Sequence, residues 1–169
     1  MNWEAIGSIG EIVGAAGVIF TLAFLAIQIR QNTSSIKTQS EIEMSFKIAE
    51  WHGRVSINPE LSKIYDDAIR DPESMSDGDV GRFIWFMAEL YYIYEGCYFL
   101  YRKGDISKDS WNTKMDAAKT LLEIPHLQKW WDSRATPLTP EFVDHIDSIR
   151  DGDSFWTLQS QEEFLGKSE

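Results

Sequence analysis

The chain has 169 residues, of which 27 are acidic and 16 are basic, so its formal net charge is −11. Such an acidic chain repels the phosphate backbone and carries no basic stripe to offset that repulsion, so we expect no nucleic-acid partner. Cys97 is the only cysteine, which excludes a disulfide within the chain. Its aromatic neighbours predict a buried structural thiol rather than a reactive one.

The first predicted element is an apolar segment at residues 12–29, IVGAAGVIFTLAFLAIQI, in which only Thr21 and Gln28 are polar. Arg30 follows it directly. A helix of this length crosses the hydrocarbon core of a bilayer, and the segment is too long for an ordinary strand. The sequence therefore predicts a transmembrane segment at residues 1–30 and a water-soluble α-helical domain at residues 31–169.

Three alternatives compete with a membrane span. A secretory signal peptide begins with positive charge, but Glu4 and Glu11 precede the apolar segment and no Lys or Arg does, so we expect the segment to be retained. A helix lying on the membrane surface needs a charged face, which this segment lacks. The third alternative is the buried core helix of a soluble bundle.

The charges flanking the segment predict its orientation. Arg30, Lys37 and Lys47 follow the segment, and no basic residue precedes it. Lys and Arg close to a span are retained on the cytoplasmic side. We therefore expect the N-terminus outside and the helical domain in the cytoplasm.

The N-terminal region also carries a regular spacing of small and polar residues. Steps of three and four place one set of residues on a single side of a helix, here called the stripe: Glu4, Gly7, Glu11, Gly14, Val18, Thr21, Leu25 and Gln28. In lipid, small residues and interhelical hydrogen bonds drive helices together, and a repeat of 3.5 residues implies left-handed supercoiling. The stripe therefore predicts self-association, whereas the alternative is that glycine is simply common in membrane helices.

Caps, prolines and glycines mark the later helices. The first helix is expected to continue to about residue 55, because neither Gly nor Pro interrupts residues 31–52. A second helix is expected to begin at Asn58-Pro59 and to end before Pro72, and a third is expected at 80–101 after a cap at 76–79. A fourth is expected from 105–107 to Leu122, followed by a short helix that begins at Pro125. The last is expected at 142–149, after the start signal Thr139-Pro140-Glu141. No segment shows a sustained strand alternation, so the fold class is all-α.

Two regions are expected to complete the bundle. Residues 83–101 contain nine aromatic residues, which predicts a central helix surrounded by others. Glu89 and Glu95 argue against a second span there, and a pocket for a flat aromatic ligand is an alternative use of the rings. After Gly152, an apolar tail is expected to dock on the bundle: Phe155, Trp156, Leu158, Phe164 and Leu165.

Motifs for enzymatic chemistry were sought in the sequence and not found. The three histidines, His52, His126 and His145, lack the spacing of zinc or di-iron ligands, and no phosphate-binding loop or serine elbow occurs. Glu141 and His145 are spaced to interact along one helix face, as a surface pair rather than a metal site. We predict no enzyme activity, no cofactor and no metal.

Three segments together resemble a widespread family of short, uncharacterised bacterial single-span membrane proteins: WEAIGSIGEIVGAAGVIFTLAFLAIQIRQNT, YEGCYFLYRKGDISKDSW and WWDSRATPLTPEFVDHI. The resemblance spans nearly the whole chain. It implies a bacterial inner-membrane setting and brings no activity and no site residues. The layout is also similar, in outline, to small membrane accessory proteins of bacterial antiviral systems that assemble as oligomeric pores.

Two functions follow as hypotheses from these features. The first is a homo-oligomeric scaffold or interaction module, anchored in the membrane by its N-terminal helix and presenting an acidic helical domain. The alternative is a channel in which Glu4, Glu11, Thr21 and Gln28 line a water path and favour cations. The protein partner of a scaffold cannot be read from the sequence.

Overall fold

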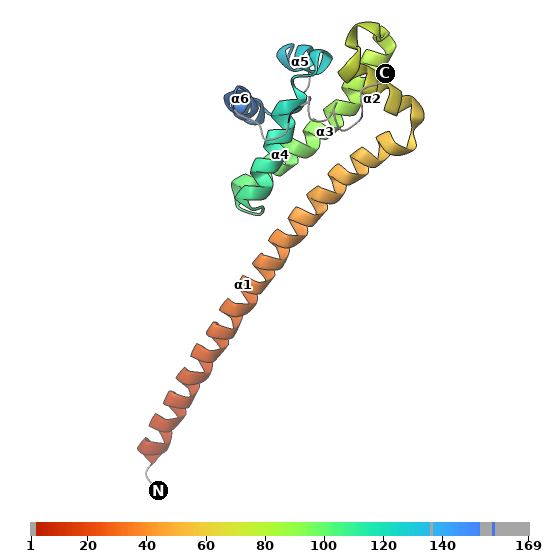
Figure 1. Ribbon diagram of the computed structural model, residues 1–169. Coiled ribbons are helices and arrows are strands. Elements are labelled where there is room, and N and C mark those ends of the chain that lie inside the picture. Colours follow the sequence, from red (N-terminus) through yellow and green to blue (C-terminus); the bar gives the residue numbers. More distant parts are fainter. Residues whose placement is uncertain (1–2, 136, 153–156, 158–169) are drawn as a thin grey trace. The chain divides into compact units, whose positions relative to one another are not determined.

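The computed structural model describes residues 3–135, 137–152 and 157, apart from the side chains of residues 4–6. Helices and one short 3₁₀ turn make up its regular structure (Figure 1): α1 Trp3–Ile57, α2 Pro59–Arg70, η1 Pro72–Ser74, α3 Asp77–Lys103, α4 Lys108–Leu121, α5 Pro125–Asp132 and α6 Pro140–Ile149. No strand occurs among the described residues. The predicted all-α class is confirmed, and so is a long apolar N-terminal helix followed by shorter ones.

The chain divides into two units, residues 1–39 and residues 40–169. From Trp3 onward the first unit is a single stretch of helix within α1, and the second unit contains the core. The predicted continuation of the first helix is confirmed, since α1 passes through Gly53 and ends at Ile57.

The predicted caps determine where the later helices begin. The Asn58 carboxamide oxygen accepts hydrogen bonds from the backbone N–H groups of Glu60 and Leu61, at 3.0 and 3.1 Å, and starts α2. The Ser76 hydroxyl accepts one from the N–H of Asp79 at 3.2 Å and starts α3. Each bond satisfies a donor that the first turn of a helix leaves unpaired. Gly104 ends α3 with φ of 75°, a left-handed conformation that glycine adopts without steric cost.

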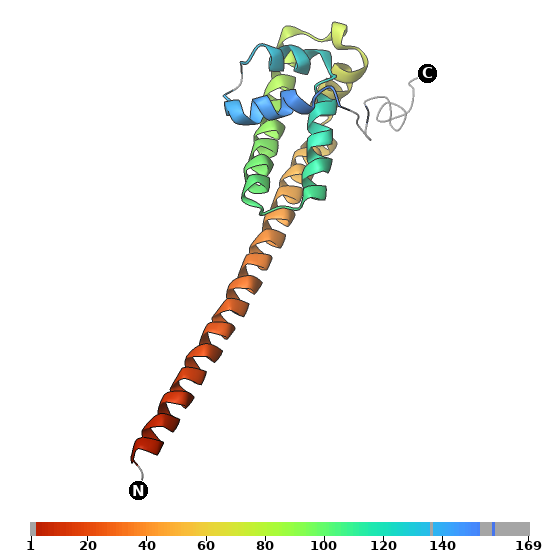
Figure 2. The same ribbon diagram turned by 90° about the vertical axis from the view of Figure 1, so that its left-hand side faces the viewer.

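Helix α3 is the central helix of the second unit, because α2, α4 and α5 all pack against it. Figure 2 shows α4 running beside α3, while α6 packs on α4. Tyr91, fully buried on α3, donates its hydroxyl proton to the Ala118 carbonyl oxygen of α4 at 2.6 Å. The hydrogen bond satisfies the one polar group that the buried ring brings into the core.

The prediction that α3 is enclosed on every side is wrong. Trp85 is 76% exposed, and Tyr92 and Phe99, one and two heptads further along, are also exposed. A spacing of seven places these three rings on one face of the helix. The helices of this unit cover the opposite face, where Phe83, Leu90 and Cys97 are buried.

Glu141 and His145 differ from the expected pairing along α6. Glu141 pairs with Arg102 of α3, and no ion pair joins it to His145 among the described residues. The His145 ring lies instead beside Tyr98 and Trp111, with ring centroids 5.3 and 5.2 Å away. The expected interaction between Glu141 and His145 is therefore not formed among the described residues, and the carboxylate pairs with a cation on the neighbouring helix instead. The predicted docking of the apolar tail concerns residues outside those that the structure describes.

Candidate functional sites: an apolar helix and a pocket

The apolar part of α1 presents its side chains outward. The large side chains of residues 12–29 are exposed, with Ile12 at 69% and Phe20 at 76%. The helix is long and apolar enough to cross a membrane, and none of its most apolar stretch is buried within the chain. A soluble bundle would cover such a helix to remove its apolar surface from water. The described residues therefore give no support to the alternative of a buried core helix.

The helical backbone brings the residues of the stripe onto one side of α1. Gly7, Glu11, Gly14, Thr21 and Gln28 are all exposed. Glu4 lies within α1, but its side chain is outside what the structure describes. The Thr21 hydroxyl donates to the Gly17 carbonyl oxygen at 2.9 Å, a bond within the helix.

The glycines of this region pack against no other described part of the chain. A Cβ atom added at Gly7, Gly10, Gly14 or Gly17 would meet, beyond its own stretch of helix, no described atom within 4 Å. Glycine also weakens a helix by roughly 1 kcal/mol relative to alanine. The open space at these positions leaves room for another helix to approach, although glycine is also simply common in membrane helices.

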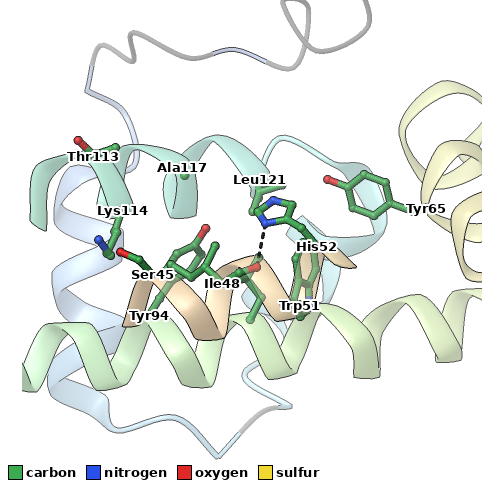
Figure 3. Close-up of a pocket in the computed structure, with 11 residues that line it drawn as sticks. Ser45, Ile48, Trp51, His52, Tyr65, Tyr94, Thr113, Lys114, Ala117 and Leu121 are labelled. Atoms are coloured by element: carbon green, nitrogen blue, oxygen red, sulfur yellow. Dashed lines mark hydrogen bonds between the residues drawn. The ribbon is translucent and has the colours of Figure 1, made fainter. Parts of the chain in front are cut away.

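A second feature is a pocket in the second unit, among α1, α2, α3 and α4 (Figure 3). Its volume is about 460 Å³. The wall is mostly apolar, and the lining residues are Ser45, Ile48, Trp51, His52, Tyr65, Leu90, Tyr94, Thr113, Lys114, Ala117 and Leu121.

Several polar groups of the pocket make hydrogen bonds within their own helices. The Ser45 hydroxyl donates to the Glu41 carbonyl oxygen at 2.9 Å, and His52 Nδ1 lies 2.9 Å from the Ile48 carbonyl oxygen. The Lys114 ammonium donates to the Ser110 hydroxyl at 2.7 Å. Figure 3 shows Ser45 and Lys114 toward one end of the pocket and His52 toward the other.

The Tyr94 hydroxyl differs from these groups. It makes no hydrogen bond to any residue that the structure describes, although the side chain is only 4% exposed. Figure 3 shows it directed into the pocket, between α1 and α4. Burial raises the pKa of Tyr94 above its ordinary value, so the group stays a neutral donor.

One end of the pocket is positively charged. Lys114 is the single Lys, Arg, Asp or Glu among the lining residues. Nearby, the Glu41 carboxylate accepts the Ser107 backbone N–H at 2.5 Å, at the start of α4. That hydrogen bond, with a smaller contribution from the charge of Lys114, lowers the pKa of Glu41.

The other titratable groups of the core have structural explanations. Cys97 is fully buried, and burial raises its pKa to about 11, so the predicted structural thiol is confirmed as buried. Glu89 accepts two hydrogen bonds from Arg54, both at 2.5 Å. Glu95 accepts the Thr139 backbone N–H at 2.6 Å. The two carboxylates thus face different elements, as their spacing of six residues predicts.

Sequence reasoning placed several lining residues correctly but did not find the pocket. Ile48, Trp51 and Leu121 are apolar residues of predicted helices, and Tyr94 lies within the predicted aromatic helix at residues 83–101. Nothing in their spacing distinguishes a core contact from a cavity wall, because a cavity depends on the distance between helices. The sequence also does not indicate that Lys114 borders a pocket, because lysines are common on exposed helix surfaces.

The chain matches no protein-family model, no curated protein and no solved structure.

Proposed function

We propose that this protein is a single-pass protein of the bacterial inner membrane. In this proposal, its N-terminal helix associates with copies of itself, and its acidic helical domain serves as a scaffold or interaction module. The observation that carries the proposal is the exposed apolar surface of α1, which the described residues do not bury. Each large apolar side chain moved out of water contributes about 1.5–3 kcal/mol, so a bilayer is the favoured environment. The helix also satisfies its own backbone hydrogen bonds, which a membrane span requires.

The setting and orientation rest on sequence features. Arg30, Lys37 and Lys47 follow the apolar segment, and none precedes it, which supports a cytoplasmic helical domain. The bacterial inner membrane rests on the resemblance of the three sequence segments described above.

Self-association rests on the stripe and on the open space at its glycines. Gly10 and Gly14 form a small-xxx-small pair, and a neighbouring helix can approach closely there. Thr21 and Gln28 offer side chains for hydrogen bonds between helices. A partner helix would also remove Glu11 from lipid, where an isolated carboxylate is costly.

A channel is the second candidate, because the same stripe carries Glu11, Thr21 and Gln28 on one helix side. In a sufficiently large ring, these side chains would line a lumen that favours cations. We favour the scaffold, because close packing at glycines does not require a ring large enough for a lumen.

Membrane extraction tests the span. The full-length protein should stay with membranes after alkaline carbonate treatment and dissolve only in detergent. A matched variant, Phe20→Lys with Phe24→Lys, should leave the membrane fraction, because each central charge costs about 2.5–3.5 kcal/mol on insertion scales. Full-length protein that is soluble without detergent would contradict the proposal.

Cysteine labelling tests the orientation. In a Cys97→Ala background, a membrane-impermeant maleimide applied to spheroplasts should label Ser8→Cys and spare Ser34→Cys. Lysis should expose both positions to the reagent. The reverse pattern in intact spheroplasts would place the helical domain outside the cytoplasm.

A further inference from the structure

The pocket among α1, α2, α3 and α4 is not used by self-association of the N-terminal helix. We propose that it binds a small amphipathic carboxylate, with the hydrocarbon body inside the pocket and the carboxylate at Lys114. Its volume of about 460 Å³ falls within the usual range of small-molecule sites, roughly 300–1,000 Å³.

The wall of the pocket suits a hydrocarbon body. Ile48 of α1, Leu90 of α3, and Ala117 and Leu121 of α4 supply aliphatic surface from three helices. The Trp51 ring adds an aromatic surface and is itself almost completely buried. An apolar pocket of this kind gains free energy when a hydrocarbon replaces the water inside it.

The charge of the pocket selects an anion over a cation. The chain carries 27 acidic residues against 16 basic ones, yet none of the lining residues is acidic and one is a lysine. The nearby Glu41 carboxylate is held by the Ser107 backbone N–H, outside the pocket lining. Lys114 donates one hydrogen bond, to the Ser110 hydroxyl, and an ammonium group has three donors. A ligand carboxylate can accept another.

The Tyr94 hydroxyl supplies a second, independent reason for a ligand with oxygen atoms. The Tyr94 side chain is 4% exposed, and its hydroxyl points into the pocket, where it is not fully enclosed and makes no hydrogen bond to a described residue. Water in the empty pocket can accept its proton, and a ligand that displaces this water must supply an oxygen atom in its place. A purely apolar occupant would leave the hydroxyl unsatisfied.

Titration of the full-length protein in lipid nanodiscs tests the proposal. The probe is octanoate labelled with ¹³C at the carboxyl carbon, followed by NMR, with octanol as the uncharged ligand of equal length. Nanodiscs without protein measure partition into lipid. We expect saturable octanoate binding that the empty nanodiscs lack, and weaker binding of octanol.

Three variants connect binding to the pocket. Lys114→Gln should weaken octanoate roughly tenfold and leave octanol nearly unchanged, because one charge-assisted hydrogen bond is lost. The matched control, Lys47→Gln, removes an exposed lysine of α1 outside the pocket and should change neither ligand. Ala117→Trp should fill the cavity and abolish binding of both ligands while the helical content measured by circular dichroism is retained.

Several outcomes would overturn the proposal. One is no saturable binding by the full-length protein. Another is an equal loss of octanoate affinity in Lys47→Gln and Lys114→Gln, which would indicate a general charge effect. If Ala117→Trp fails to fold, unchanged octanoate binding in both Lys114→Gln and Tyr94→Phe would refute the proposal by itself.

Discussion

Trp51 makes two separate contacts with Phe86. The rings stack with centroids 4.3 Å apart and planes inclined by 16°, and the indole N–H donates to the Phe86 carbonyl oxygen at 2.9 Å. Trp51 is 1% exposed and lies on α1, while Phe86 lies on α3. This pair joins the last turns of α1 to the central helix, and the Arg54–Glu89 ion pair, one turn further along each helix, strengthens the same junction.

Truncation of Trp51 should destabilise the second unit strongly. Trp51→Ala leaves a cavity, so we expect the free energy of unfolding to fall by about 3–5 kcal/mol. Trp51→Phe keeps a ring but loses the hydrogen bond, which contributes about 1 kcal/mol. Urea unfolding followed by circular dichroism measures both changes. Trp85→Ala, at a ring that is 76% exposed, is the control and should cost less than about 0.5 kcal/mol. A cost at Trp85 equal to that at Trp51 would contradict the assigned packing.

Substitution of Gly14 should weaken assembly of the N-terminal helix. Gly14→Leu places a large side chain where the proposed helices come closest, so the protein in detergent should shift to smaller species in analytical ultracentrifugation. Ile19→Leu is the control, because Ile19 lies off the stripe and is exposed. If the two variants sediment alike, the stripe is not the interface.

Ion flux separates a scaffold from a channel. For a scaffold, liposomes that contain the purified protein should show no flux above background, and Glu11→Gln should leave assembly intact or tighten it, because repulsion between carboxylates is removed. For a channel, Glu11→Gln should reduce cation preference and Glu11→Lys should reverse or block it. Flux in the wild type that Glu11→Lys abolishes would decide against the scaffold.

His145 should make stability depend on pH. Its Nε2 atom is buried and has no hydrogen-bond partner among the described residues, and burial lowers the pKa of His145 below its ordinary value of 6.5. The unfolded chain therefore binds a proton at higher pH than the folded one. The contribution of the neutral ring to stability is complete above pH 6.5 and is lost as the pH falls toward the lower folded pKa.

The midpoint of urea unfolding between about pH 7.5 and 5 tests this dependence, in a range above the ordinary pKa of carboxylates. His145→Phe keeps a ring between Tyr98 and Trp111 but cannot titrate, so its midpoint should change less with pH than that of the wild type. Identical pH profiles for the two proteins would show that His145 does not titrate in this range.

Local features of the chain were predictable from the sequence. Asn58 and Ser76 cap the helices they were expected to cap, and α3 ends at Lys103, close to the expected end at residue 101. Thr139 shows the limit of this reasoning. It does precede α6, but its hydroxyl makes no capping bond and donates instead to the Glu95 carboxylate at 2.8 Å. A helix cap depends on residues close together in the sequence. Whether an acceptor on another helix, such as Glu95 of α3, competes for the same hydroxyl depends on how the helices pack.

The sequence by itself determined the all-α class, the length and apolarity of the N-terminal helix, and the register of its stripe. These properties depend on residues a few positions apart, and backbone geometry relates such residues directly. Only the tertiary structure decided that α3 keeps an open aromatic face, that Trp51 stacks on Phe86, and that Tyr94 and Lys114 border one pocket. Those outcomes depend on which faces of separate helices meet and how closely, and side-chain packing across the whole unit sets both.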